Sequence, residues 1–330
     1  MSGVVIFGTR PEAIKLAPVV ECLRKDGRLP DFQVICTGQH AEIIRQTLGS
    51  LNFSVNENMN LMRHNQTPRE VVERITVKLS QRLGSDRPDW VLVQGDTATA
   101  FAGTLFGYLG GSTVIHLEAG LRTHDIYEPW PEEGFRQEIA RLAGLHLAPY
   151  SSSVKNLLTE GIPENDIRTI GNPGLDTLKA TLAHCGKEDD SWLPDGDFFL
   201  VTIHRRENVG ERLKKTCRNL QTLLSEYPQY TILWPVHPNP KVRQFVLEYF
   251  SGLNDRVLLC APLEYPQFLR AQAAASVVIS DSGGVQEEAA SLGTRVAVVR
   301  EKTERPDVAS LGLTKIVGAD ARGLSEAALV

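Results

Sequence analysis

Short apolar runs rich in β-branched residues recur along this 330-residue chain, and several end abruptly at a charged or glycine-rich tip. Runs that are apolar at every position indicate parallel strands buried on both faces, because strands with one solvated face alternate apolar and polar residues. Helix-like segments separate the runs, so the pattern predicts an α/β fold. We expect strands at residues 3–7, 32–36, 90–94, 113–117, 145–148, 167–170, 198–203, 230–236, 256–260, 276–280, 295–299 and 314–317.

A polar, acidic segment rich in helix and strand breakers, residues 184–197, separates two groups of strands. We interpret it as a linker between a first domain at 1–183 and a second at 198–330. The length of the chain agrees with about two domains of ordinary size. The pattern therefore predicts two doubly wound, Rossmann-like parallel-sheet domains facing each other across a cleft. The last expected strand lies close to residue 330, so we expect a short final helix.

Polar residues follow six of the expected strands directly. Ligands of open α/β sheets bind beyond the carboxyl ends of the strands, so these tips are expected to form one polar cleft from both halves of the chain. The tips are Thr9–Glu12, Gly95–Asp96, Glu118–Gly120, His204–Glu207, His237 and Asp281–Gly284.

Composition narrows the function classes. A formal net charge of −5 argues against nucleic acid or an anionic membrane as the main partner. Five cysteines without CxxC or Cys/His ligand spacing indicate reduced thiols and no zinc site. The first strand begins almost at Met1 and leaves no room for a signal peptide, and no apolar run reaches membrane-spanning length. We therefore expect a cytoplasmic protein.

The segment after the strand at 276–280 has the features of an anion site. Ser282–Gly284 precede a helix with an apolar stripe, whose first N–H groups and dipole attract an anion, and glycine lets a diphosphate approach closely. Glu288, one turn on, suits the ribose hydroxyls, so the set indicates a nucleoside diphosphate. The alternative is an ordinary serine-capped helix start. Neither a P-loop nor GxGxxG occurs in the chain.

Two cations and several proton carriers occupy other tips. Arg10 and Lys15 flank a helix start at Pro11, where they would strengthen an anion site; the alternative is a solvated surface pair. Three carboxylates gathered in one cleft, Asp96, Glu118 and Glu132, can have separated pKa values and supply one base and one acid. One such residue alone would more often be a helix cap. His204 and His237 could donate to phosphate or shuttle protons, or be structural.

The motifs at the strand tips, in their order along the chain, resemble those of the non-hydrolysing UDP-N-acetylglucosamine 2-epimerase family, which has the two-domain GT-B architecture. The matching strings are GTRPEAIK, TGQH, VQGDT, HLEAGLRT, PWPEE, HRREN, VHPNP, SDSGGVQEEA and TERP, in family order from residue 8 to about 306. The resemblance implies a UDP-sugar substrate, no cofactor, neither NAD nor a metal, and a homodimer. It implies catalytic roles for Asp96, Glu118, Glu132 and His204, and substrate contacts for His204, Arg10, Lys15, Arg136, His237, Phe268, Ser282, Gly283, Gly284, Glu288 and Arg305.

The reaction implied by the resemblance is reversible inversion at C2 of UDP-GlcNAc, giving UDP-ManNAc. The C2–H has no neighbouring carbonyl, so its proton can leave only as the C1–O bond to UDP breaks. The path is elimination of UDP to a 2-acetamidoglucal, followed by re-addition with the proton delivered to the opposite face. Such a path needs donors on the departing diphosphate and two proton carriers, and the tips supply both.

Some positions depart from the family pattern. Phe135 replaces a usual Asn, His124 replaces a usual Gly, and Pro173–Gly174 interrupts a usual Thr-Val/Ile run. Members activated by their own substrate bind a second UDP-GlcNAc through a Gln and an Arg, and these positions hold Glu42 and Asn65 here. We therefore expect no substrate activation.

Other functions remain open at the level of sequence. One is the hydrolysing 2-epimerase, which releases free ManNAc and UDP, and another is an epimerase for a modified UDP-2-acetamido sugar. A GT-B glycosyltransferase would use the same nucleotide residues, although it has little need for three carboxylates around the sugar. A non-catalytic UDP-sugar sensor is the last alternative.

Overall fold

The computed structural model separates into two compact units, Met1–Thr177 and Leu178–Val330. The division lies inside helix α7 (Pro173–His184), N-terminal to the predicted linker at 184–197. Trp192 and Leu193 pack against the core of the second unit. The structure describes residues 2–29, 31–38, 41–61, 63, 66–84, 87–184, 190–203, 210–236, 240–253, 255–300, 302–318 and 323–326.

The first unit is built on a seven-stranded sheet in the order β3-β2-β1-β4-β5-β6-β7, and all of its pairings are parallel. The chain runs outward from β1 to β3 and then returns to place β4 beside β1. This reversal is the topological switch point, where doubly wound sheets bind ligands. The strands are β1 Ser2–Phe7, β2 Asp31–Cys36, β3 Glu57–Asn58, β4 Trp90–Gln94, β5 Thr113–Leu117, β6 Leu145–Ala148 and β7 Ile167–Thr169.

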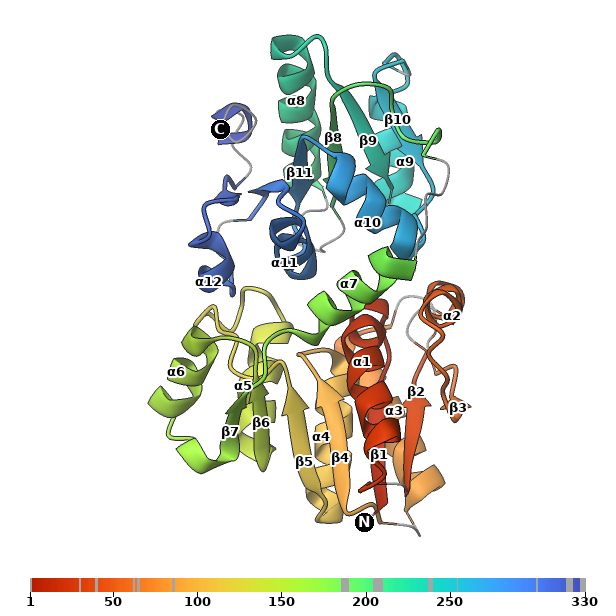
Figure 1. Cartoon of the computed structure of the whole chain (residues 1–330), viewed down its shortest axis with the longest axis vertical. Coiled ribbons are helices and arrows are strands. Elements are labelled where there is room, and N and C mark those ends of the chain that lie inside the picture. Colours follow the sequence, from red (N-terminus) through yellow and green to blue (C-terminus); the bar gives the residue numbers. More distant parts are fainter. Residues whose placement is uncertain are drawn as a thin grey trace. The chain divides into compact units, whose positions relative to one another are not determined.

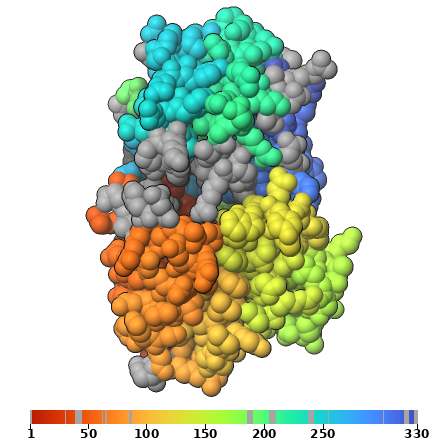
Figure 2. Space-filling model, turned by 180° about the vertical axis from the view of Figure 1, so that it is seen from behind, coloured from red at the N-terminus to blue at the C-terminus, as the bar shows by residue number. Residues whose placement is uncertain are grey.

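Side chains of a strand alternate between the two faces of a sheet, and the strands of this sheet carry apolar side chains on both. Helices therefore cover both faces. Val4 and Ile6 of β1 pack against α3 and α4, whereas Val5 and Phe7 pack against α1 on the other face. Figure 1 shows α1 in front of the sheet, and Figure 2, from behind, shows the orange surface formed by α3 and α4. The helices are α1 Arg10–Asp26, α2 Ala41–Ser50, α3 Pro68–Leu83, α4 Ala98–Gly110, α5 Glu132–Leu142, α6 Ser151–Thr159 and the 3-10 turn η1 Glu164–Asp166.

The second unit repeats this plan in a six-stranded parallel sheet of order β10-β9-β8-β11-β12-β13. Its switch point lies between β8 and β11. Phe199 and Val201 of β8 pack with α8 and α9, and Phe198 and Leu200 pack with α10 and α11. The elements are β8 Phe198–Thr202, α8 Glu211–Glu226, β9 Thr231–Pro235, α9 Pro240–Tyr249, β10 Val257–Cys260, α10 Tyr265–Ala274, β11 Val277–Ser280, α11 Gly283–Ser291, β12 Arg295–Val298, α12 Pro306–Ala309 and β13 Thr314–Ile316.

The predicted α/β class with two parallel sheets is confirmed, and every strand expected from the sequence is present within a residue or two. The two-residue strand β3 was not expected, because Glu57–Asn58 form no apolar run and are ordered by pairing with the end of β2. Within the described ranges, no helix combines the length and apolarity that a membrane span requires.

The packing of Gly3 against Trp90 gives a test of the first core. A Cβ at Gly3 would overlap the indole ring of Trp90, which is buried. Gly3→Ala should lower the free energy of unfolding by about 1–3 kcal/mol, as overpacking does in well-packed cores. Urea unfolding of the full chain measures the change.

Gly49→Ala is the matched control, because a Cβ at this exposed position of α2 meets nothing within 4 Å. It should leave stability unchanged or raise it by about 0.5–1 kcal/mol, since alanine favours the helix. A Gly3→Ala variant as stable as wild type would contradict the observed packing.

Candidate functional site

The strand tips of the first unit meet beside its switch point. The register pairs Gln94 of β4 with Leu117 of β5, so Gly95 and Glu118 occupy neighbouring positions beyond the strand ends. The Gly95 N–H donates to the Leu117 carbonyl at 2.9 Å. Gly95 and Glu118 both have left-handed backbones, with φ of 70° and 66°. A glutamate in this conformation is strained, and such residues cluster at functional sites.

Glu118 is held by two side chains. Lys15 Nζ, from the second turn of α1, lies 2.5 Å from Glu118 Oε1, and both side chains are about nine-tenths buried. Gln94 Nε2 donates to the other oxygen, Oε2. The predicted phosphate cation Lys15 therefore contacts a predicted catalytic carboxylate in this structure. Its contact with a phosphate stays a prediction.

Asp96 is joined to α5 through Arg136. The Arg136 guanidinium donates through Nη2 to Asp96 Oδ2, and its Nη1 lies 3.2 Å from Glu133 Oε2. Arg136 and Glu133 are buried. Glu132 is the first residue of α5, and Arg136 lies one turn later on the same helical face. The ion pair therefore places the tip of β4 against the face of α5 that carries Glu132.

Glu133 is a structural member of this site that the sequence did not single out. Its carboxylate accepts the backbone N–H of Thr123 at 3.1 Å and that of His124 at 3.2 Å, which fixes the loop after β5. His124 has a left-handed φ of 62°, which explains why glycine is usual at this position. Phe135, another departure, stacks on Phe101 with ring centroids 4.8 Å apart. Local packing and hydrogen bonds thus accommodate these two of the departures.

Glu12 links the turns after β1 and β4. Its Oε2 accepts the N–H groups of Gly8 at 3.0 Å and Thr9 at 2.7 Å, together with the Thr9 hydroxyl. Its Oε1 accepts the Thr97 hydroxyl at 2.8 Å. Burial raises the pKa of the Glu12 carboxyl to about 7, and these hydrogen bonds oppose the rise. Arg10, the predicted cation of the same turn, is half-buried as the first residue of α1.

The second unit has the predicted strand–turn–helix at β11 and α11. Ser282 is the N-cap residue of α11, yet its side chain makes no capping hydrogen bond to the helix. The ordinary serine-capped junction is therefore not what forms here. The first N–H groups of a helix lack intrahelical partners, and with the dipole they bind anions. Ser282–Gly284 therefore lie at the start of α11 as expected, and their contact with a diphosphate stays a prediction.

Arg305 lies against Gly283 in a buried cluster of charges. A Cβ at Gly283 would come within 2.6 Å of Arg305 Cζ, so any larger residue here would displace the Arg305 guanidinium or the start of α11. Arg305 Nε lies 3.1 Å from Glu287 Oε2, and Nη1 contacts Glu304, whose other oxygen accepts from Arg300 at 2.7 Å. The two arginines offset the two glutamates, as buried charges require. The sequence analysis identified Arg305 but not its partners, which lie in the strings SDSGGVQEEA and TERP.

Glu288 is oriented by α10. The Tyr265 hydroxyl donates to Glu288 Oε1 at 3.1 Å, and Gln272 Nε2 donates to Oε2 at 3.0 Å. The side chain of Phe268 is buried in the core beneath α11, with Val285. Its predicted contact with the nucleotide stays a prediction.

Several predicted positions lie outside the described residues. These are His204, His237 and Asn65, and the side chain of Glu42 is also not described. Among the residues that are described, no group of three His, Cys, Asp or Glu side chains could hold a metal ion.

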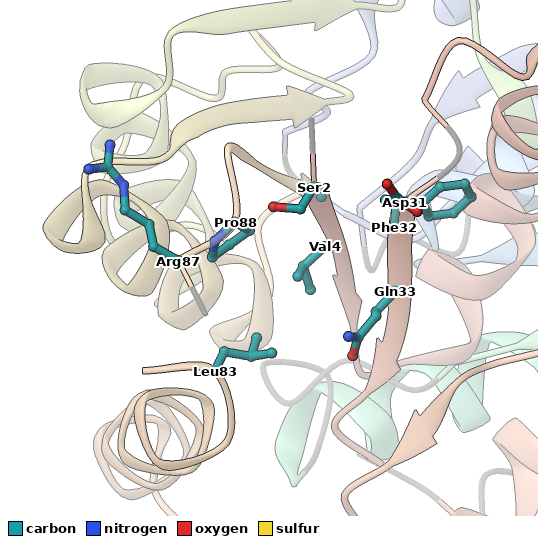
Figure 3. A pocket seen from close by; sticks show the side chains of 9 residues that line it. Ser2, Val4, Asp31, Phe32, Gln33, Leu83, Arg87 and Pro88 are labelled. Atoms are coloured by element: carbon teal, nitrogen blue, oxygen red, sulfur yellow. The ribbon is translucent and has the colours of Figure 1, made fainter. Parts of the chain in front are cut away.

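A pocket of about 520 Å³ lies elsewhere in the first unit (Figure 3). It is lined by the first residues of β1 and β2, with Leu83, Arg87 and Pro88. These residues belong to the amino-terminal edge of the sheet, whereas Asp96 and Glu118 follow the carboxyl ends. Because doubly wound sheets bind ligands at the carboxyl edge, we do not assign this pocket to the candidate site.

Comparison with known proteins identifies the family. The sequence model described as UDP-N-acetylglucosamine 2-epimerase matches residues 23–329. A Bacillus subtilis UDP-N-acetylglucosamine 2-epimerase is 38% identical over 327 residues, covering 98% of this chain and 85% of that protein.

Two solved structures are also similar. The Neisseria meningitidis UDP-GlcNAc 2-epimerase bound to UDP-GlcNAc has a TM-score of 0.93 and 37% identity, covering 99% of this chain and 90% of that one. The Methanocaldococcus jannaschii enzyme in complex with UDP-GlcNAc and UDP has a TM-score of 0.91 and 33% identity, covering 99% and 91%. The strand-tip motifs, the two parallel sheets and these likenesses agree: the chain belongs to the UDP-N-acetylglucosamine 2-epimerase family.

Proposed function

We propose that this chain catalyses the reversible epimerisation of UDP-N-acetylglucosamine at C2, giving UDP-N-acetylmannosamine. The observation that carries the proposal is the pair of carboxylates at adjoining strand tips, Asp96 and Glu118, each contacted by a buried cation. Family membership and the UDP-GlcNAc-bound relatives support the choice of substrate.

The proposed step is an elimination followed by its reverse on the other face. A base takes the C2 proton, the C2–H electron pair forms a C1=C2 double bond, and the C1–O bond pair leaves with the β-phosphate oxygen of UDP. The resulting 2-acetamidoglucal is then protonated at C2 from the opposite face while UDP attacks C1. Asp96, Glu118 and Glu132 supply the proton acceptor and donor, with His204 as a further member of the catalytic set.

The cations beside these carboxylates have a physical role in this scheme. Several negative charges at one sheet edge repel one another and would repel a diphosphate sugar. Lys15 and Arg136 offset that repulsion by direct contact with Glu118 and Asp96. A carboxylate in such a pair keeps a fixed direction, which general acid–base catalysis needs.

The second unit is proposed to hold UDP as the leaving group. The N–H groups of Gly283 and Gly284 and the hydroxyl of Ser282 suit the diphosphate, on which negative charge grows as the C1–O bond breaks; the Ser282 N–H itself donates to the Ser280 hydroxyl at 3.0 Å. Glu288, which Tyr265 and Gln272 orient, would accept hydrogen bonds from the ribose hydroxyls. The Arg305 guanidinium packs against Gly283, the first residue of α11, and would hold the start of this helix in place for the diphosphate.

A cytoplasmic homodimer is part of the proposal. The dimer is supported by the family resemblance. The location is supported by the cysteines, since Cys22, Cys36, Cys217 and Cys260 are free thiols in the described chain.

Epimerisation in heavy water tests the proposed route. UDP-GlcNAc incubated with the protein in D₂O should give UDP-ManNAc carrying deuterium at C2, because the proton removed exchanges with solvent before the return step. NMR of the C2 position measures the label. Inversion without deuterium would exclude elimination, and free sugar with equal UDP would show the hydrolysing reaction instead.

Asp96→Asn, Glu118→Gln and Glu132→Gln test the acid–base assignment. Each should lower kcat by about 10²–10⁴-fold, the contribution of a positioned proton carrier. Each should still bind UDP in calorimetry, since the nucleotide residues are unchanged. Glu138→Gln, at an exposed position of the same helix as Glu132, is the control and should keep wild-type turnover. Full activity of all three variants would refute the assignment.

Gly283→Ala tests the nucleotide site. Its Cβ would overlap the Arg305 guanidinium, so either Arg305 or the start of α11 must move. UDP affinity should fall about tenfold or more, a loss of ~1.4 kcal/mol or more. Gly252→Ala, in the same unit and with nothing within 4 Å of its Cβ, should bind UDP as wild type does. Isothermal titration measures both, and unchanged affinity of Gly283→Ala would contradict the assignment.

A further inference from the structure

The turn that carries Asp96 is held from both sides by buried side chains. The turn connects β4 to α4 and consists of Gly95, Asp96 and Thr97. On one side, His116 Nε2 of β5 lies 2.8 Å from the Gly95 carbonyl oxygen. On the other, Glu12 of α1 accepts the Thr97 hydroxyl. The predicted catalytic carboxylate therefore lies between two anchored residues.

The chemistry of the His116 contact defines its direction. His116 is fully buried, and burial lowers the pKa of its imidazole to about 3, so the ring is neutral near pH 7. A carbonyl oxygen can only accept a hydrogen bond, so Nε2 carries the proton and donates to Gly95. Because Gly95 has a left-handed backbone, this bond fixes the peptide plane that leads into Asp96.

The Glu12 contact joins the two turns at the switch point. The same carboxylate accepts from Gly8 and Thr9 after β1 and from Thr97 after β4. Thr97 is also the N-cap of α4 and accepts the N–H of Ala100 at 3.0 Å. A shift of the β4 turn would therefore break a hydrogen bond to the buried Glu12 carboxylate and a helix cap together.

We propose that His116 and Glu12 are positioning residues, which hold Asp96 at its reacting place by fixing the Gly95–Thr97 turn from both sides. The inference rests on the proposed function, because it assigns Asp96 to proton transfer. A misplacement of about 1 Å can cost a reaction about 10²-fold in rate. Loss of either anchor should thus lower kcat and leave KM nearly unchanged, since nucleotide binding does not depend on this turn.

His116→Met and His116→Gln form the first matched pair. The two side chains have the same length, but only glutamine can donate to the Gly95 carbonyl. His116→Met should lower kcat by about 10–100-fold with KM within about threefold, and His116→Gln should restore most of the loss. Equal kcat losses in the two variants would overturn the proposal.

His146→Met is the control for the loss of a buried imidazole. His146 lies opposite His116 in the β5–β6 register, is also buried, and bonds to the Ala143 backbone instead of the turn. It should lower the thermal unfolding temperature about as much as His116→Met while keeping kcat. If His146→Met lowers kcat as much as His116→Met does, the effect is general destabilisation and the proposal fails.

Thr97→Val and Thr97→Ser test the other anchor. Serine keeps the hydroxyl that donates to Glu12 and caps α4, and valine lacks it. Thr97→Val should lower kcat and Thr97→Ser should not. The double variant His116→Met/Thr97→Val should lose less than the product of the single losses, because both act through one turn. Losses that multiply fully would overturn the shared role.

Amide hydrogen exchange over residues 95–97 separates this inference from the proposed function. Exchange there should rise in His116→Met and in Thr97→Val, and stay unchanged in His146→Met. If the wild-type protein does not turn over UDP-GlcNAc, the proposed function fails while exchange still reports whether the turn is anchored. If turnover is present but exchange is unchanged in His116→Met, the positioning role fails and the function stands.

Discussion

Parallel pairing of β1 with β4, and of β8 with β11, is the constraint on which the functional residues of each unit depend. Parallel strands bring their carboxyl ends to one edge of a sheet, and the reversal of strand order leaves a gap between the helices that follow the two central strands. In the first unit this edge receives Thr9, Gly95 and Glu118. In the second it receives Ser282 and the start of α11. The parallel register aligns the carboxyl ends of neighbouring strands, so residues that follow these strands lie close together although they are far apart in the sequence.

Burying charge at such an edge is unfavourable unless each charged group has a partner. In both units, buried or partly buried carboxylates are paired with a lysine or an arginine. In the first unit Lys15 contacts Glu118, and Arg136 contacts both Asp96 and Glu133. In the second, Arg305 contacts Glu287 and Glu304. Such pairs add little net stability, but they fix direction. We interpret them as the means by which the fold presents a set of charged groups in one arrangement.

The sequence predicted the strands well because most of them contain a short run rich in apolar, β-branched residues, a signal that depends on local composition alone. It also predicted the tips, because a polar residue that directly follows a buried strand must lie at the sheet edge. It did not predict the partners of those tips. Glu133 and Glu287 sit on helices among other charged residues, and their contacts depend on helix rotation and on loop paths that no short pattern encodes. The two-residue strand β3 was missed for the same reason, since it depends on a neighbour.

The arrangement in the first unit favours proton transfer over transfer of a sugar to an acceptor. A transferase that holds UDP in the second unit needs a base for its acceptor, and one carboxylate would serve. Here Asp96 and Glu118 lie at adjoining tips, and Arg136 joins Asp96 to the helix that begins with Glu132. Glu118 adopts a strained backbone, and Asp96 is carried by a turn anchored on both sides. Strain and buried charge that fix several carboxylates at one edge agree with the proposed reaction, in which a proton leaves one face of a ring and returns to the other.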